Sequence, residues 1–358
     1  MPQPRQPKRG RGWMIAAIIL FVFLAISVLM NFGQMISSFG GGVKGVGMHT
    51  RVAGPRLDEA ILEDNDASEK IAVIDVDGII TSRSLDQSGF TMVDLIKSQL
   101  ERAKDDSKVK AIVLRVDSPG GEVLASDEIY RVISDFQKES SKPIIASMGN
   151  LAASGGYYIS APCRWIVANE LTITGSIGVI MHTWNYRGLM NKVGLAPQVY
   201  KSGKFKDMLS GERNLDEIPP EERAMVQGLI DETYGRFKEV VAEGRGEAHR
   251  LNKDEGRALA DDWASYADGR VLSGTQAHEL GFVDSLGNFQ DAVKKAAELG
   301  HVTEKKPNLI RYQQRYDLSD FLNIFGKNES RVIKVDLGME APKLQAGQLY
   351  FLAPTFVH

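Results

Sequence analysis

The chain has 358 residues and a mass of 39.4 kDa, enough for one large domain or two modest ones with a hydrophobic core. Hydrophobic residues make up 43% and charged residues 25%, which excludes a wholly disordered or fibrous protein. The formal net charge of −3 argues against a general nucleic-acid binder. The single cysteine excludes an intramolecular disulfide and a cysteine-based zinc cluster, and six scattered histidines show no metal-ligand spacing, so neither a metal nor a cofactor is expected.

The N-terminal region carries basic residues and then an uncharged apolar run. Seven of the 43 basic side chains and none of the 46 acidic ones fall within residues 1–57. The run 13–32 is long enough for a helix that crosses the ~30 Å hydrocarbon core of a bilayer. Because basic flanks stay in the cytoplasm, the sequence predicts a cytoplasmic stub at 1–12, a single transmembrane signal anchor at 13–32 and an extracytoplasmic remainder. A cleaved signal peptide is the alternative, but no Ala-x-Ala exit follows the run.

After the anchor, the sequence predicts a tether and then alternating strands and helices. Residues 33–70 are first glycine-rich and then acidic, which is typical of a flexible tether. The tail 300–358 has weak patterning and ends in FLAPTFVH, which is expected to be a subunit-contact arm or a disordered extension. The alternation between these segments predicts a layered α/β domain. Strands are expected at 71–80, 109–116, 143–148, 165–168 and 177–181, and helices at 92–104, 126–138, 219–243 and 288–299, with shorter elements over 271–280.

Two glycine-rich junctions follow predicted strands, where backbone N–H groups can point at a ligand. One is DSPGG, which ends at Gly121, and the other is MGNLAASGGYYIS, in which Ser154 stands at the predicted start of a helix. Serine is a favoured N-cap, so a purely structural role for Ser154 stays open. However, Gly155 and Gly156 each cost about 1 kcal/mol relative to alanine in a first turn, which favours a close approach to this backbone. Ser154 is therefore a candidate nucleophile.

A nucleophilic serine needs a general base. No histidine lies in a recognisable triad context, although the sequence does not exclude a histidine base. The segment YKSGKFKDMLSGE offers Lys201, Lys204 and Lys206 instead, while most lysine runs are simply solvated surface. A lysine base must be neutral, so burial would have to lower its pKa from ~10.4 toward 7.

Four motifs occur in the order and spacing of a known family. They are DSPGG, MGNLAASGGYYIS, TGSIGVI and KSGKFKDMLS, and the later stretch DGRVLSGTQAHELGFVDSLG fits as well. Together they closely resemble the bacterial signal peptide peptidase A family, peptidase family S49, over residues 71–299. The resemblance implies a Clp/crotonase-like spiral of β-β-α units at 71–299, after one transmembrane helix. Residues 300–358 would form a C-terminal extension of unassigned role.

The resemblance also implies the site and its chemistry. Ser154 would be the nucleophile of a serine–lysine dyad, and the N–H groups of Gly121 and Gly155 would form the oxyanion hole. Lys206 is favoured as the base, with Lys201 as its rival. Family members are homo-oligomers that hydrolyse apolar peptides, the remnants of signal peptides, at the bacterial cytoplasmic membrane. The dyad is then expected to join neighbouring chains.

Two other functions compete with a protease. A crotonase-type acyl-CoA enzyme would share the glycine-rich oxyanion hole. However, a domain tethered outside the cytoplasm would not have access to CoA thioesters, which are cytosolic. A non-catalytic oligomeric membrane scaffold would not need an intact dyad. Other polar residues have structural interpretations: Ser118 as a turn residue, Ser176 as a groove-lining or locally hydrogen-bonded residue, and Cys163 as a small buried side chain.

Overall fold

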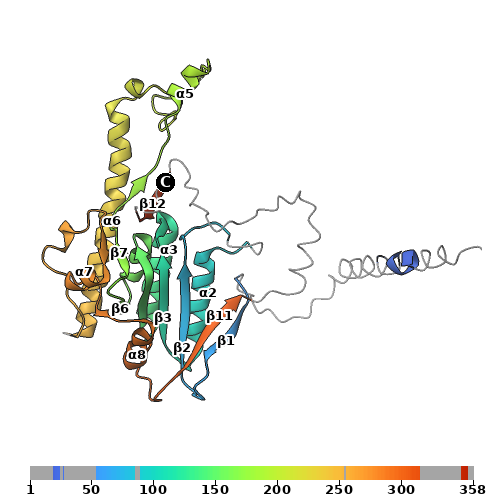
Figure 1. Cartoon of the computed structure of the whole chain (residues 1–358), viewed down its shortest axis with the longest axis vertical. Helices are drawn as coiled ribbons and strands as arrows, with labels where there is room; N and C mark the ends of the chain where they lie inside the picture. Colours follow the sequence, from blue (N-terminus) through green and yellow to red (C-terminus); the bar gives the residue numbers. More distant parts are fainter. Residues whose placement is uncertain are drawn as a thin grey trace, which may run out of the picture. The chain divides into compact units, whose positions relative to one another are not determined.

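The computed structural model describes residues 19–24, 27, 54–84, 89–253, 255–314 and 348–353, and the residues from Gly54 onward form one compact unit (Figure 1). Residues 19–24 and 27 are helical and belong to a separate unit, Met1–Ala53. Among the described residues, no helix has the length and apolar character needed to span a bilayer. Most of the predicted anchor at 13–32 lies outside the described residues.

A mostly parallel sheet forms the centre of the unit. Within the described residues it has nine strands in the order β1-β11-β2-β3-β5-β6-β10, and β7 pairs with both β5 and β9. Strands β1 and β9 are antiparallel to their neighbours and the other pairs are parallel. The strands are β1 (Leu57–Glu63), β2 (Lys70–Asp77), β3 (Val109–Ser118), β5 (Ile144–Ala153), β6 (Trp165–Ala168), β7 (Ile173–Gly175), β9 (Val271–Ser273), β10 (Ser285–Leu286) and β11 (Asn308–Gln314).

A second, smaller sheet lies beside the carboxyl ends of β3 and β5. It consists of β4 (Gly120–Glu122), β12 (Leu349–Leu352) and β8 (Ile180–Met181), with β12 in the middle and antiparallel to both neighbours. Strand β4 follows β3 after a single residue, Pro119, so the large sheet and the small one meet at this turn.

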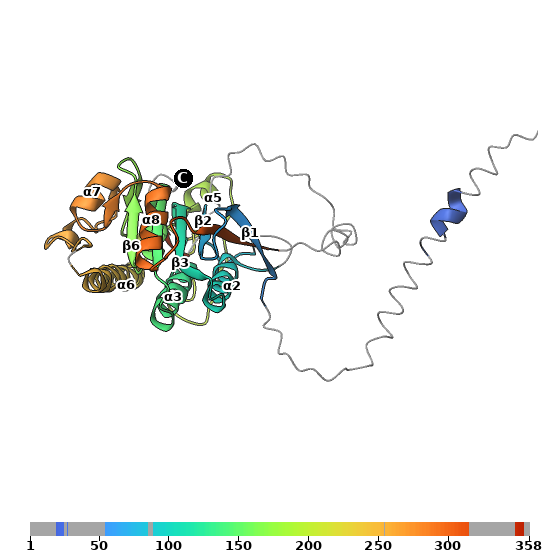
Figure 2. The same cartoon turned by 90° about the horizontal axis from the view of Figure 1, so that it is seen from below.

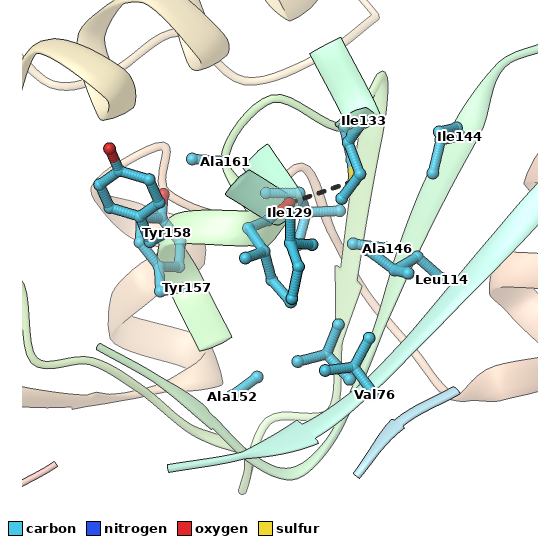
Figure 3. Close-up of a cluster of buried hydrophobic side chains, with 14 of the residues drawn as sticks. Val76, Leu114, Ile129, Ile133, Ile144, Ala146, Ala152, Tyr157, Tyr158 and Ala161 are labelled. Atoms are coloured by element: carbon cyan, nitrogen blue, oxygen red, sulfur yellow. Dashed lines mark hydrogen bonds between the residues drawn. The ribbon is translucent and has the colours of Figure 1, made fainter. Parts of the chain in front are cut away.

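Helices cover both faces of the large sheet because successive side chains of a buried strand point to opposite faces. On β3, Ile112 and Leu114 join the larger core cluster, whereas Val113 joins the smaller one against α8. Figure 2 shows α2, α3 and α6 along one side of the sheet, and Figure 3 shows Leu114 in the same cluster as Ile129 and Ile133 of α3. The helices are α2 (Met92–Asp105), α3 (Val123–Glu139), α4 (Gly155–Ser160), α5 (Arg187–Lys192), α6 (Pro220–Asn252), α7 (Gly274–Glu279) and α8 (Phe289–Leu299), with 3-10 turns at Leu215–Glu217 and Trp263–Ser265.

The predicted α/β class is confirmed, and most predicted elements lie within a few residues of the observed ones. Strand β5 runs on to Ala153 through a stretch predicted as a turn, and no sequence pattern indicates the short strand β7. Strand β1 lies in the predicted tether and β11 in the predicted C-terminal extension. Six of the seven β1 side chains are exposed or half-exposed, which explains why this edge strand lacks a buried-strand pattern.

A long projection, which we call the arm, consists of residues 182–233. It contains α5 and the first half of α6 and extends away from the sheet (Figure 1). Proline at the first position and Glu221 and Glu222 in the first turn are favourable for starting α6. The second half of α6 packs on the core through Phe237 and Val241, whereas the arm leaves large apolar side chains exposed. The arm is therefore held at one end only.

Candidate active site

Ser154 lies on a sharp turn between β5 and α4. Its backbone has φ 54° and ψ −117°, a conformation that costs a non-glycine residue about 1–3 kcal/mol. Ser154 occupies the N-cap position of α4, but its side chain makes no capping hydrogen bond, so the N-cap explanation does not account for it. The hydroxyl is buried, and among the described residues it has no hydrogen-bond partner. A serine on a strained strand-to-helix turn with an unused hydroxyl has the geometry of a nucleophile.

The two predicted oxyanion-hole glycines lie next to this turn. A Cβ atom placed on Gly155 would lie 3.1 Å from the Gly121 nitrogen and 3.0 Å from the Gly120 Cα. A Cβ atom on Gly156 would lie 2.8 Å from the Ser118 carbonyl oxygen. Because the glycines after Ser154 have no side chains, β4 can lie close to α4. Such a close approach is the reason that the sequence suggested for placing two glycines in a first helical turn, where they are unfavourable. The amides of Gly121 and Gly155 come together beside Ser154, where such donors can stabilise a developing oxyanion.

Strand β4 is fixed from its other edge by the segment around Ile80. The Ile80 nitrogen donates to the Gly120 carbonyl oxygen at 2.9 Å, and the Glu122 nitrogen donates to the Ile80 carbonyl oxygen at 2.8 Å. The Glu122 carboxylate accepts hydrogen bonds from Ser82 and from Thr81. Burial raises the pKa of Glu122, but these hydrogen bonds, led by that from the Ser82 hydroxyl, outweigh burial and hold the pKa below its usual value. A charged Glu122 thus helps to position the Gly121 amide.

The structure does not bring the candidate lysines to Ser154 within one chain. Lys206 is an exposed residue of the arm, and within the described ranges its amine has neither a hydrogen bond nor an ion pair. Lys201 lies on the same segment and donates to both carboxylate oxygens of Asp207, at 2.7 and 2.8 Å. The Lys201 amine is thus already occupied by an ion pair on its own segment. Arg213 bridges Asp207 and Glu222 and so links this segment to the start of α6.

The other polar residues have local structural roles. The Ser118 hydroxyl accepts a hydrogen bond from the Gly120 nitrogen at 3.1 Å, as expected of a turn residue. Ser176 donates its N–H to Arg270 and lines a cavity of 760 Å³ beside β8. Cys163 is buried, as predicted, and burial raises the pKa of its thiol to about 12, which disfavours the reactive thiolate. Among the described residues, no three side chains of metal-binding type come together.

One element of the site has no counterpart in the sequence patterns. Strand β12 lies along β4 with Phe351 opposite Gly121, whereas this tail was expected to be a contact arm or a disordered extension. The segment is short, and no local periodicity distinguishes it. The remaining tail residues, 354–358, lie outside the described residues.

Known proteins share much of this sequence. The family model for peptidase family S49 matches residues 136–303. A putative protease of Synechocystis sp. is 41% identical over 243 residues, which cover 67% of this chain and 78% of that protein. A putative signal peptide peptidase SppA of Enterococcus faecium is 37% identical over 254 residues, which cover 69% of each chain. Among solved structures, a mutant of a membrane-bound stomatin-specific protease in complex with a substrate peptide has a TM-score of 0.40 and 17% identity, covering 72% of this chain and 98% of that chain.

Proposed function

Since the chain belongs to peptidase family S49 and is thus a protease, we propose that it is a membrane-anchored serine endopeptidase with Ser154 as its nucleophile and Lys206 as its general base. The observation that carries the proposal is the strained Ser154, which has a buried hydroxyl without a partner among the described residues and is followed directly by Gly155, which lies against Gly121. The finer fold description, a Clp/crotonase-like spiral preceded by a transmembrane helix, belongs to the same proposal.

The proposed reaction uses each of these groups once per acyl transfer. A neutral Lys206 amine accepts the Ser154 proton as the oxygen attacks the peptide carbonyl carbon. The amides of Gly121 and Gly155 stabilise the oxyanion. The protonated lysine then donates to the leaving amine, which gives an acyl ester on Ser154. Water hydrolyses the ester by the same proton transfers in reverse order.

The exposed position of Lys206 supports a site shared between chains. An exposed lysine is charged at neutral pH, and a neighbouring chain that buries the amine would favour the neutral form that a base needs. The arm has the surface for such a contact, because Trp184 is 72%, Leu189 64% and Tyr200 92% exposed. Exposed apolar side chains gathered on one projection are typical of an association surface. We therefore propose a homo-oligomer in which the arm of one chain carries Lys206 to Ser154 of the next.

The proposed substrates are apolar peptides, including signal-peptide remnants at the bacterial cytoplasmic membrane. The cavity next to Ser176 has Val179, Ile180 and Ile230 in its lining, which suits apolar side chains. Strand β12 pairs with both β4 and β8 within the chain, so an extended peptide that bound there by strand addition would take its place. The uncharged run at 13–32 would hold the enzyme at the membrane.

Hydrolysis of an apolar fluorogenic peptide by the full chain in detergent micelles tests the dyad. Ser154→Ala and Lys206→Ala are each expected to lower kcat by at least about a thousandfold, because each removes a group that acts in the transition state. Lys204→Ala is the matched control, since Lys204 is an exposed neighbour paired with Glu221, and it should retain activity. Loss of turnover in Lys201→Ala but not in Lys206→Ala would assign the base to Lys201. Full activity in Ser154→Ala would refute the serine mechanism.

Mixing the two inactive variants tests whether the dyad joins neighbouring chains. If chains exchange freely in a 1:1 mixture of Ser154→Ala and Lys206→Ala, about a quarter of the sites would receive an intact serine and an intact lysine. Activity should return to about that fraction of the wild-type value. A mixture that exchanges chains, as shown by co-purification of differently tagged copies, yet stays inactive would contradict a shared site.

A further inference from the structure

Helix α4 is a short element that has to hold the strained Ser154 turn at its start. It has six residues and begins with two glycines, so its own helix propensity is too weak to keep it formed. A backbone in a rare conformation persists only where the surrounding structure fixes it. Before the helix, the Ser154 nitrogen donates to the Gly175 carbonyl oxygen of β7 at 2.8 Å. The other end of α4 needs an attachment as well.

Arg245 of α6 supplies this attachment. Its Nη1 atom donates to the carbonyl oxygen of Cys163 at 3.1 Å and to that of Ala161, the C-cap residue of α4, at 3.4 Å. The last carbonyl groups of a helix have no partner within the helix, and a cation beside them is favourable. A Cβ atom on Gly244 would lie 2.5 Å from the Ala161 carbonyl oxygen, so α6 lies directly against this end of α4.

Asp284 ties Arg245 to the sheet. The Nη2 atom of Arg245 donates to Oδ2 of Asp284, and both side chains are fully buried. The same carboxylate oxygen accepts from the Ile166 nitrogen at 2.8 Å, and the Asp284 nitrogen donates to the Ile166 carbonyl oxygen at 3.0 Å. Ile166 belongs to β6. A line of hydrogen bonds therefore runs from β6 through Asp284 and Arg245 to the end of α4.

A second link joins α4 to the segment that carries Asp284. Tyr157, the third residue of α4, donates its hydroxyl to the Phe282 carbonyl oxygen at 3.0 Å. The two rings meet edge to face with their centres 5.7 Å apart. Figure 3 shows Tyr157 beside Tyr158 on α4. Since Phe282 precedes Asp284 by two residues, the segment 282–284 holds α4 both through Tyr157 and through Arg245.

A gain in stability is a poor explanation for this buried ion pair. Replacing such a pair with apolar side chains is often neutral or stabilising, because the attraction between the charges only partly offsets the cost of removing both from water. An arginine side chain, however, carries a planar fork that bonds several groups at fixed angles. One end of the Arg245 fork bonds the carbonyl groups at the end of α4, and the other end bonds Asp284. This geometry is suited to fixing a position.

We propose that Arg245, held by Asp284, is a positioning residue for Ser154 of its own chain. It fixes the C-terminal end of α4, and through this short helix it fixes the turn that orients the Ser154 hydroxyl and the Gly155 amide. The inference rests on the proposed function, because it takes Ser154 as the nucleophile. It adds a residue of α6 that acts on the reaction only through α4.

The separate values of kcat and KM for the apolar fluorogenic peptide test this role in the full chain in detergent micelles. Arg245→Lys keeps a buried positive charge beside Asp284 but loses the fork. It should lower kcat by about tenfold or more and leave KM within about threefold, because small displacements of reacting groups slow the chemical step strongly. Arg311→Lys is the matched control, since Arg311 of β11 pairs with Asp75 of β2 at 2.8 Å, and it should keep kcat within about twofold.

Two further variants separate positioning from stability. Val113→Ala opens space in the smaller core cluster against α8 and should lower the unfolding midpoint, while kcat measured well below that midpoint stays within about twofold. Arg245→Met combined with Asp284→Asn removes both charges together but leaves an acceptor for the Ile166 nitrogen. This double variant should unfold near the wild-type temperature and still lose about tenfold in kcat. It decides the question if Arg245→Lys does not fold.

Mixed oligomers show which active site Arg245 serves. In a mixture of Ser154→Ala and Lys206→Ala chains, the Lys206→Ala chain supplies the serine and the Ser154→Ala chain supplies the lysine. Arg245→Lys should lower the recovered activity about tenfold when it stands in the chain that supplies the serine, and less than about twofold in the other chain. A loss confined to the chain that supplies the lysine would mean that Arg245 supports the arm instead. Equal losses in both arrangements would mean general destabilisation.

The outcomes separate this inference from the proposed function. If Ser154→Ala retains hydrolysis, the proposed function fails. If Ser154 is essential but Arg245→Lys and the double variant both keep kcat within about twofold, Arg245 only supports the fold. The same conclusion follows if Val113→Ala loses as much kcat as these variants do.

Discussion

Replacing Ser154 with glycine should stabilise the protein while abolishing hydrolysis. The positive φ costs a serine about 1–3 kcal/mol, and glycine adopts it without strain. Glycine also loses about 0.5–1 kcal/mol more backbone entropy on folding. An unpartnered buried hydroxyl destabilises the folded state by about 1–3 kcal/mol. Ser154→Ala removes this hydroxyl but keeps the strained backbone. Ser154→Gly is therefore expected to exceed Ser154→Ala in stability by roughly 0.5–2 kcal/mol.

Thermal unfolding followed by circular dichroism, with the full chain in detergent micelles, measures this difference. At ~2–4 °C per kcal/mol for a unit of this size, Ser154→Gly should unfold about 1–8 °C above Ser154→Ala. Because both variants lack the nucleophile, catalysis does not influence the comparison. A lower midpoint for Ser154→Gly than for Ser154→Ala would mean that the turn is not strained, and the structural case for a nucleophile would fall.

Ser160, at the other end of α4, is the matched control. It is also buried, but its hydroxyl donates to the Gly156 carbonyl oxygen at 2.8 Å and it lies within the helix. Ser160→Ala should lower stability through the lost hydrogen bond, and Ser160→Gly should lower it further by up to about 1 kcal/mol. At Ser154 the glycine variant should therefore be more stable than the alanine variant, whereas at Ser160 the alanine variant should be the more stable one.

Three other predictions concern stability. A Cβ atom on Gly244 would lie 2.5 Å from a backbone oxygen, so Gly244→Ala should lower Tm. A Cβ atom on Gly246 would meet nothing within 4 Å, so Gly246→Ala should raise stability by up to about 1 kcal/mol. Equal shifts of Tm in the two variants would contradict this packing. Asp284→Asn removes the charge that offsets a fully buried arginine and should cost about 3–5 kcal/mol in urea unfolding, and a loss below 1 kcal/mol would argue against a charged pair. The hydrogen bonds of Ser82 hold the pKa of Glu122 below 4.5 despite burial, so the stabilisation by its charge is complete above pH 4.5 and disappears as the pH falls through the lower folded-state pKa. Glu122→Gln should therefore unfold at a lower temperature than the wild type at pH 7 and at the same temperature in strong acid, and a pH-independent difference would refute this role.

Local patterns were sufficient for part of the fold and for singling out Ser154 as a candidate. Helix α8 and strand β6 match their predicted ranges within a residue, because both combine clear periodicity or a buried run with recognisable ends. Ser154 stood out because two glycines follow it where helix formers belong. In each case the physical signal lies within a few consecutive residues.

The parts that local patterns did not indicate depend on contacts between distant residues. Strand β11 joins the sheet by pairing with β2 on one edge and with β1 on the other, both of which lie far before it in the sequence, and nothing in these strands alone specifies their partners. The same holds for Phe351, whose ring packs on Tyr158 and Phe237, two residues far from it in the sequence. The lysine position is a further case, because in the proposed assembly the arm of one chain brings Lys206 to Ser154 of another.

The position of β11 between β1 and β2 has a consequence for the order in which the protein is made. Strand β1 is the first strand of the large sheet to be made, yet its only partner in the described sheet is β11, the last strand of that sheet to be made. Until then, β1 has no strand to pair with, while β2, β3 and β5 can already associate. The edge of the sheet that β1 forms is therefore completed only after all the other strands of that sheet have been made. A chain that stops before residue 308 would keep both Ser154 and Lys206 but expose β1 and one edge of β2 to aggregation.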